Sequence, residues 1–146
     1  MSKANKARLP GNTSGMAGVF WVASELSRRG WIALPTVRNQ KGVDIIATTT
    51  RATDSKFVEI QVKAIQGRRF WLLGPKERNE IPNRKSLFFV FVRPQSASPL
   101  ASFEAFVVPS IKVQREAKQQ RNRKFQFCWY PPERPDRYKD RWDTLG

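Results

Sequence analysis

The chain has 146 residues, 40% of them hydrophobic, which predicts one domain with one modest core. It contains no His and a single Cys, which excludes Ser-His-Asp and Cys-His catalysis, His-containing metal sites, Cys-based zinc sites and an internal disulfide. Its 27 Lys and Arg against 12 Asp and Glu give a net charge of +15 and indicate a polyanionic partner. Nucleic acid is favoured over anionic lipid, because no basic stretch carries a large apolar face.

Membrane insertion and secretion are not expected. The longest strongly apolar run, Leu87 to Val92, is far shorter than the roughly 20 residues that cross a bilayer. The first 15 residues are basic and polar and lack the apolar stretch of a signal peptide. We therefore expect a cytoplasmic protein without membrane association.

The elements expected in chain order begin with a flexible basic arm over residues 1–12, followed by a single domain over 13–146. Asn12, Thr13 and Ser14 are N-cap candidates for a helix of about residues 15–29, with Gly30 as its stop. Strands are expected over 31–34, 43–50, 57–63, 70–73, 86–92, 103–108 and 125–130. Two further helices are expected, from 110 to about 121 and over 138–145. This order predicts the α/β class with a mixed β-sheet flanked by helices, with α+β as the alternative.

The segment from 39 to 63 places polar side chains where they could do chemistry. In the 57–63 strand, apolar residues alternate with Glu59, Gln61 and Lys63, which therefore share one face. Asp44 lies on the preceding strand and offers a carboxylate to a hard divalent cation, and Gln61 can add its amide oxygen. The Lys63 ammonium can orient or deprotonate a water or stabilise a phosphate, and Glu59 is the nearest spare carboxylate.

Three runs together resemble the PD-(D/E)xK, or restriction-endonuclease-like, superfamily, and within it small prokaryotic members of unassigned role. They are G-M-A-G-V-F-W at 15–21, G-V-D-I-I-A at 42–47 and E-I-Q-V-K at 59–63. The resemblance covers about residues 13–73. It implies a restriction-endonuclease-like mixed sheet flanked by helices, and Mg²⁺-dependent phosphodiester hydrolysis. It also implies that Asp44 is the metal-binding acid, Gln61 the residue at the (D/E) position and Lys63 the catalytic lysine.

The chain departs from the family pattern at two positions. Gln61 replaces a carboxylate, although an amide oxygen can still coordinate a metal. Val19 stands where family members often carry a Glu, directly after the second Gly of G-x-x-G. Glu25 cannot substitute for it, because six residues along a helix place the two side chains about 120° apart around the axis.

Other basic and aromatic residues are candidates for nucleic-acid contact. The cations expected to contact phosphates are Arg68, Arg69, Lys112, Arg115, Lys118, Arg121, Arg123 and Lys124. The five Trp residues lie within apolar periodic runs, so we expect them to pack in the core rather than to stack on bases.

These observations predict a nucleic-acid-binding endonuclease that uses Mg²⁺ and acts on DNA, with Asp44, Gln61, Lys63 and Glu59 as its site. Two alternatives remain open at this point: a catalytically decayed nuclease-fold DNA-binding module, and a basic RNA-associated protein. A homodimer is one expected arrangement, because two sites related by a dyad can cut both strands of a duplex.

Overall fold

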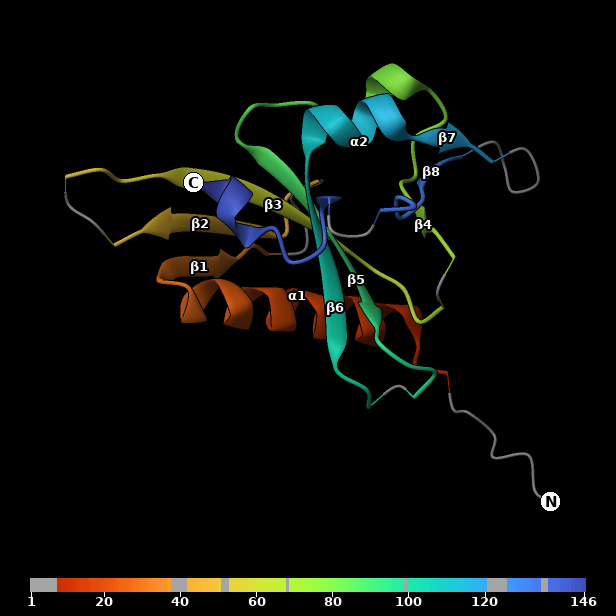
Figure 1. Cartoon of the computed structure of the whole chain (residues 1–146), viewed down its shortest axis with the longest axis horizontal. Helices are drawn as coiled ribbons and strands as arrows, with labels where there is room; N and C mark the ends of the chain where they lie inside the picture. The colour runs from red at the N-terminus through yellow and green to blue at the C-terminus, as the bar shows by residue number, and fades with distance from the viewer. Residues whose placement is uncertain are drawn as a thin grey trace.

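The chain folds into two α-helices and two β-sheets over the residues that the structure describes (Figure 1). The computed structural model describes residues 8–37, 42–50, 53–67, 69–98, 100–120, 126–134 and 137–146. The elements are α1 (Gly11–Arg28), β1 (Trp31–Pro35), β2 (Ile45–Thr49), β3 (Phe57–Ala64), β4 (Trp71–Leu72), the 3₁₀ helix η1 (Arg78–Glu80), β5 (Leu87–Pro94), β6 (Phe103–Pro109), α2 (Ser110–Glu116), β7 (Lys118–Gln119), β8 (Phe127–Trp129) and the 3₁₀ helix η3 (Trp142–Leu145). The protein thus belongs to the α/β class, as predicted.

The main sheet is mixed and has five strands in the order β1-β2-β3-β5-β6. The strands expected over 31–34, 43–50 and 57–63 are β1, β2 and β3, and they form an antiparallel meander with Ile45 opposite Ile60. β5 runs parallel to β3, with Phe91 opposite Lys63, and β6 returns antiparallel to β5. The candidate site residues of β3 therefore lie on the central strand of the sheet.

Helix α1 covers one face of this sheet, and one half of the core lies between them (Figure 1). Val22 and Leu26 of α1 are fully buried against Ile60 and other apolar residues of β2, β3, β5 and β6. Gly18 allows the helix to approach β3 closely, because a Cβ at this position would lie 2.9 Å from the Ala64 Cβ. The second glycine of the G-x-x-G motif is therefore a packing requirement next to the end of β3.

Helix α1 starts earlier than predicted, at Gly11, and none of Asn12, Thr13 and Ser14 caps it. Its N-cap is Pro10, without a side-chain hydrogen bond. Proline has no N–H to leave unsatisfied, so it is well tolerated where a helix begins. Leu9 lies against the domain, where both of its backbone polar groups bond the Gln66 side chain. Residues 1–7 of the expected arm lie outside the described residues.

The opposite face of the main sheet is covered by α2 and by a small sheet in the order β4-β8-β7 (Figure 1). Aromatic side chains fill the space between the two layers. The Trp129 ring stacks on the Phe91 ring with their centroids 4.3 Å apart, and the Trp71 centroid lies 5.7 Å from that of Trp129. Trp31 and Trp142 are buried within the α1 half of the core. The prediction that the tryptophans serve packing is confirmed for these four rings.

Two predicted helices are wrong in extent. The helix expected to reach about residue 121 ends at Glu116, because Lys118 and Gln119 pair with β8 and extend the backbone. The helix expected over 138–145 is only the 3₁₀ turn η3. Its first residues cannot be helical, because the Tyr138 carbonyl accepts the N–H of Val107 and this stretch pairs with β6. No helix in the described part of the chain combines the length and apolarity needed to span a membrane.

Candidate active site

Asp44 directly precedes β2, whose first residue, Ile45, packs in the α1 half of the core. The backbone N–H of Asp44 donates to the carbonyl of Ile60, the partner of Ile45 in the strand register, at 2.8 Å. Its Oδ2 accepts the Val62 N–H at 2.7 Å. Burial raises the pKa of Asp44, although the Val62 hydrogen bond and the charge of Lys63 oppose the rise.

The segment before Asp44 is shaped by a tight turn and by bonds from the end of β1. Gly42 has φ of 88°, in the left-handed region that favours glycine. Thr36 forms hydrogen bonds with two consecutive carbonyl groups of this segment. Its hydroxyl donates to the Val43 carbonyl at 2.6 Å, and its N–H donates to the Asp44 carbonyl at 2.9 Å. These contacts fix the backbone from which the Asp44 carboxylate projects.

Lys63 lies near the end of β3 and interacts electrostatically with Asp44. Its Nζ lies 3.5 Å from the Leu73 carbonyl, which comes from the segment after β4. Burial lowers the pKa of Lys63, and the charge of Asp44 opposes this shift. The carboxylate and the amine are therefore close enough for each to influence the ionisation of the other.

Gln61 presents an oxygen atom that no hydrogen bond satisfies. Its Oε1 is buried and has no partner among the described residues. The side chain lines a pocket of about 570 Å³ together with Gly42, Leu73 and Glu80 of η1. An unpaired buried carbonyl oxygen is costly in a folded protein. This atom is therefore suited to accept a hydrogen bond from a ligand or to coordinate a cation.

Glu59 shares the strand face with Gln61 and Lys63, but its carboxylate is engaged elsewhere. Its Oε2 accepts hydrogen bonds from Arg84 Nε at 3.0 Å and from Ser86 Oγ at 2.8 Å. The Arg84 hydrogen bond is the main cause of the lowered pKa of Glu59. Glu59 is thus not brought together with Asp44 and Lys63.

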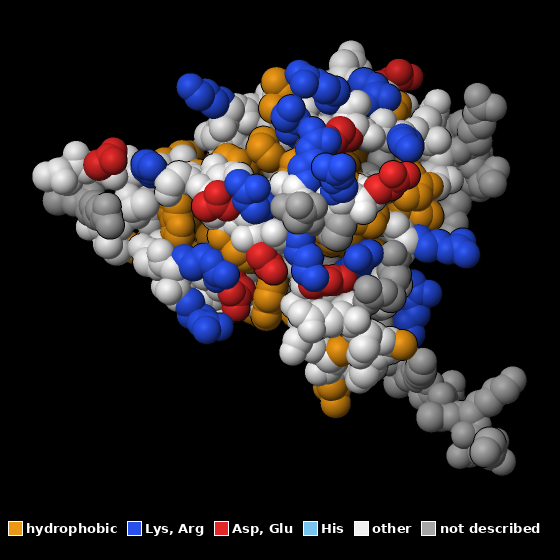
Figure 2. All heavy atoms as spheres, in the orientation of Figure 1, with side chains coloured by type: hydrophobic (Ala, Val, Ile, Leu, Met, Phe, Trp, Pro, Cys, Tyr) orange, Lys and Arg blue, Asp and Glu red, His pale blue; other side chains and the backbone are white. Residues whose placement is uncertain are grey.

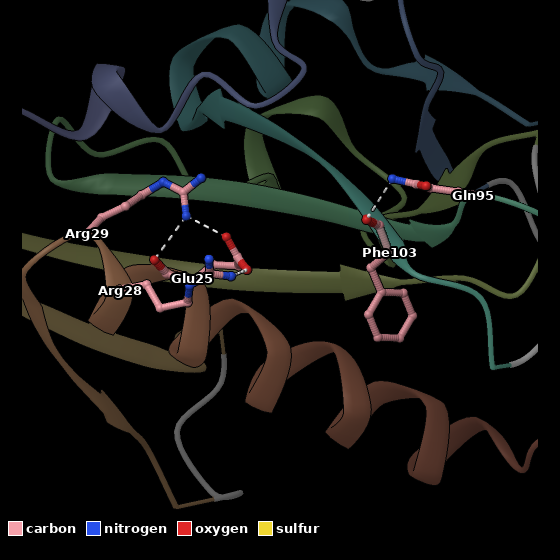
Figure 3. Close-up of polar contacts among 5 residues, drawn as sticks. All are labelled: Glu25, Arg28, Arg29, Gln95 and Phe103. Atoms are coloured by element: carbon pink, nitrogen blue, oxygen red, sulfur yellow. Dashed lines mark hydrogen bonds and ion pairs between the residues drawn. The ribbon is translucent and has the colours of Figure 1, made fainter.

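Helix α1 brings no carboxylate to these residues. Val19 is half-buried and packs against the core shared with Val22 and Leu26. Glu25 is held by Arg28 and Arg29 in the last turns of the helix, at 3.3 and 2.5 Å (Figure 3). The position that often carries an acid in the resembling family is therefore occupied here by an apolar side chain.

The donor set around Asp44 suits a hard cation that retains most of its water. Within the described ranges, no group of three or more His, Cys, Asp or Glu side chains could hold a metal ion. Mg²⁺ is commonly bound by one or two carboxylates, with waters and substrate phosphates completing its shell. The Asp44 carboxylate and the unpartnered Gln61 oxygen are the side-chain oxygens here that could serve as such ligands.

The cations predicted to contact nucleic acid are separated in the fold. Arg69 is exposed just before β4, Lys112 and Arg115 lie on α2, and Lys118 is exposed on β7. Lys118 does not share a helix with Lys112 and Arg115, because α2 ends at Glu116. Figure 2 shows Lys and Arg side chains gathered near α2 and across the middle of the face in view. The remaining four predicted contacts lie outside the described residues, at Arg68, Arg121, Arg123 and Lys124.

Sequence reasoning missed three residues that line the pockets around β3. Glu80 lines the pocket of Gln61, whereas Arg8 and Gln66 line a second pocket next to Lys63. The basic character of residues 1–12 was the signal for Arg8. No local pattern marks Glu80 or Gln66, because long-range contacts bring them to their positions.

Comparison with known proteins adds no relative: no family model, no curated protein and no solved structure matches this chain. The assignment of Asp44, Gln61 and Lys63 therefore depends on their chemistry and arrangement.

Proposed function

We propose that this protein is a restriction-endonuclease-like nuclease that hydrolyses the phosphodiester bonds of DNA with Mg²⁺ as cofactor. The observation that carries the proposal is the 2.7 Å hydrogen bond that holds the Asp44 carboxylate at Val62, between Gln61, whose buried oxygen has no partner, and Lys63 in the sequence of β3. The net charge of +15 supports a polyanionic substrate.

In this proposal, Asp44 and Gln61 supply the protein ligands of the cation. Bound Mg²⁺ would contribute charge stabilisation of the phosphate and activation of the attacking water. The Val62 hydrogen bond orients the Asp44 carboxylate, and the backbone turn at Gly42 holds the strand in place. Glu59 has no part in this set, because Arg84 and Ser86 occupy its carboxylate.

Lys63 handles the proton of the attacking water. A lowered pKa increases the neutral fraction of its amine, which can accept that proton. The water oxygen forms a new P–O bond, the bond from phosphorus to the leaving sugar oxygen breaks, and the leaving oxygen takes a proton from solvent. The protonated Lys63 ammonium then stabilises the charge on the phosphate oxygens.

The second candidate is a binding module with the same fold and no catalytic activity. The packing of Val19 into the core favours this alternative, since α1 then supplies no second carboxylate to a metal. Such a module would act through its charge alone, on DNA or on RNA.

A plasmid-nicking assay separates the two candidates. We expect the wild-type protein to nick supercoiled DNA with Mg²⁺ and not with EDTA. Lys63→Ala and Asp44→Asn should each lose most of the activity, by about 100-fold or more, because each removes a group in contact with the reacting atoms.

Lys76→Ala is the matched control, because Lys76 is exposed and lines neither pocket beside β3. It should retain full activity, and both Lys variants should bind DNA equally in EDTA. DNA binding without Mg²⁺-dependent nicking in the wild type would favour the binding module. Activity that survives in both Lys63→Ala and Asp44→Asn would place the catalytic site elsewhere.

A further inference from the structure

A pocket of about 430 Å³ opens beside Lys63, next to the start of α1. Three cationic side chains line it, those of Arg8, Lys63 and Arg69, and none of the described residues that line it is acidic. We call it the cationic pocket. Asp44 and Gln61 do not line it, so it adjoins the candidate active site and shares only Lys63 with it.

Two of the three positive charges of this pocket, those of Arg8 and Arg69, are not balanced by a carboxylate in the described part of the chain, whereas Lys63 interacts with Asp44. Neither Arg8 nor Arg69 forms an ion pair with a described carboxylate, although many other Arg side chains do. Cations that converge on one concavity repel one another. A bound anion would remove this cost.

The start of α1 adds a hydrogen-bond donor to the same concavity. Gly11 and Ser14 of the first turn line the cationic pocket. In this turn the Thr13 N–H donates to Asn12 Oδ1 at 2.9 Å and the Ser14 N–H to the Pro10 carbonyl at 3.0 Å. The Gly11 N–H has no acceptor within the helix, and no acidic residue occupies the turn. This donor supplements the three cations in binding an anion.

Two hydrogen bonds hold the N-terminal segment at the rim of the pocket. The Leu9 N–H donates to Gln66 Oε1 at 2.8 Å, and Gln66 Nε2 donates to the Leu9 carbonyl at 2.7 Å. This pair joins the residue after Arg8 to the segment that follows β3. Arg8 is therefore kept near Lys63 and Arg69.

The size and lining of the pocket suit a nucleotide rather than a bare ion. Its volume falls in the range of small-molecule sites, about 300–1,000 Å³. Phe70 lines it and is only half-buried, with the Tyr130 ring 5.2 Å away. An accessible aromatic ring beside clustered cations is the arrangement that binds a base together with its phosphate.

We propose that the cationic pocket binds the phosphate ester of one nucleotide, through Arg8, Arg69 and the start of α1. That this nucleotide adjoins a bond cleaved at Lys63 rests on the proposed function, whereas the binding itself does not. The ligand is either a unit of a nucleic-acid strand or a free nucleotide, and both present the same phosphate ester.

Calorimetric titration in EDTA tests the proposal without hydrolysis. The probes are thymidine 5′-monophosphate, thymidine, and a single-stranded thymidine oligonucleotide. We expect the monophosphate to bind and thymidine not to bind. Arg69→Ala and Arg8→Ala should each weaken monophosphate binding at least about tenfold, as expected for the loss of a charge-assisted hydrogen bond. Arg134→Ala, at an exposed arginine outside the pocket, should stay within about twofold of the wild type.

Each outcome decides. Equal binding of thymidine and the monophosphate, or unchanged binding in both pocket variants, would overturn the proposal. Tighter binding of the oligonucleotide identifies a strand as the ligand, and equal affinity identifies a free nucleotide; both support the pocket. Monophosphate binding together with failed plasmid nicking would refute the nuclease and leave the pocket. Nicking without monophosphate binding would refute the proposed pocket and leave the nuclease. Thermal unfolding of each variant shows whether it is folded.

Discussion

The carboxylate of Asp44 accepts a 2.7 Å hydrogen bond from the N–H of Val62, the residue directly before Lys63. The acid of one strand is thereby bonded to the backbone of the neighbouring strand that carries the lysine. Because side chains alternate along a strand, Val62 points into the α1 half of the core while Lys63 points to the face of Asp44. The core packing of Val62 thus positions the lysine and the acid together.

The two glycines of the G-x-x-G motif should respond in opposite ways to alanine. Gly18→Ala places a methyl group 2.9 Å from the Ala64 Cβ, so we expect a loss of about 1–3 kcal/mol in the free energy of unfolding. Gly15→Ala meets nothing within 4 Å and should gain about 0.5–1 kcal/mol, because alanine favours the helix. Urea denaturation measures both. Equal effects of the two substitutions would contradict the close approach of α1 to β3.

Val19→Glu tests whether α1 can supply the carboxylate that the resembling family often carries there. Val19 packs against the core, so the new carboxylate should lower the free energy of unfolding by about 1–3 kcal/mol. We expect no gain in Mg²⁺ affinity, measured as the shift in melting temperature on adding the ion. An increase in Mg²⁺-dependent stabilisation, or in nicking, would mean that this position faces Asp44 after all.

Nucleic-acid affinity should fall steeply with salt if phosphates are the main contacts. The slope of log affinity against log salt should be about −0.9 for each phosphate neutralised. Arg115→Glu on α2 and Lys118→Glu on β7 should each reduce the size of this slope by about 1 where the residue contacts a phosphate. The measurement is fluorescence anisotropy of labelled DNA over a salt series. A slope near zero in the wild type would argue against both candidate functions.

Local patterns were sufficient for the parts of the site that lie on neighbouring strands. The alternation of Val58, Ile60 and Val62 predicts that these three side chains of β3 face α1 and that Gln61 and Lys63 face away from it. The antiparallel pairing of β2 with β3 then brings Asp44 next to β3. The core pattern therefore predicts that Lys63 and Asp44 share a face.

Contacts distant in sequence could not be read in the same way. Gln66 bonds Leu9 from 57 residues away, and nothing in either segment signals the pairing. The end of α2 was missed for a similar reason, since Lys118 leaves the helical pattern only because β8 offers it a strand partner. Tertiary pairing overrides helix propensity there.

The ionisation of Asp44 should make the protein less stable as pH rises. Its pKa is raised from the usual 3.8 by burial, so just above that pH the folded protein keeps a proton that the unfolded chain has lost. Stability then falls as pH increases through the interval between the two pKa values, and the loss persists above it. Asp44→Asn does not titrate. We therefore expect the stability of Asp44→Asn, relative to wild type, to increase as the pH rises above 3.8.

Urea denaturation of both proteins at several pH values measures this difference, and the other carboxylates cancel because the two chains share them. A difference that stays constant would mean that the pKa of Asp44 is unshifted. A stability difference that shifts in favour of wild type as the pH rises would mean that the Val62 hydrogen bond and the Lys63 charge outweigh burial in setting the pKa of Asp44. The ionised carboxylate of Asp44 would then stabilise the folded protein.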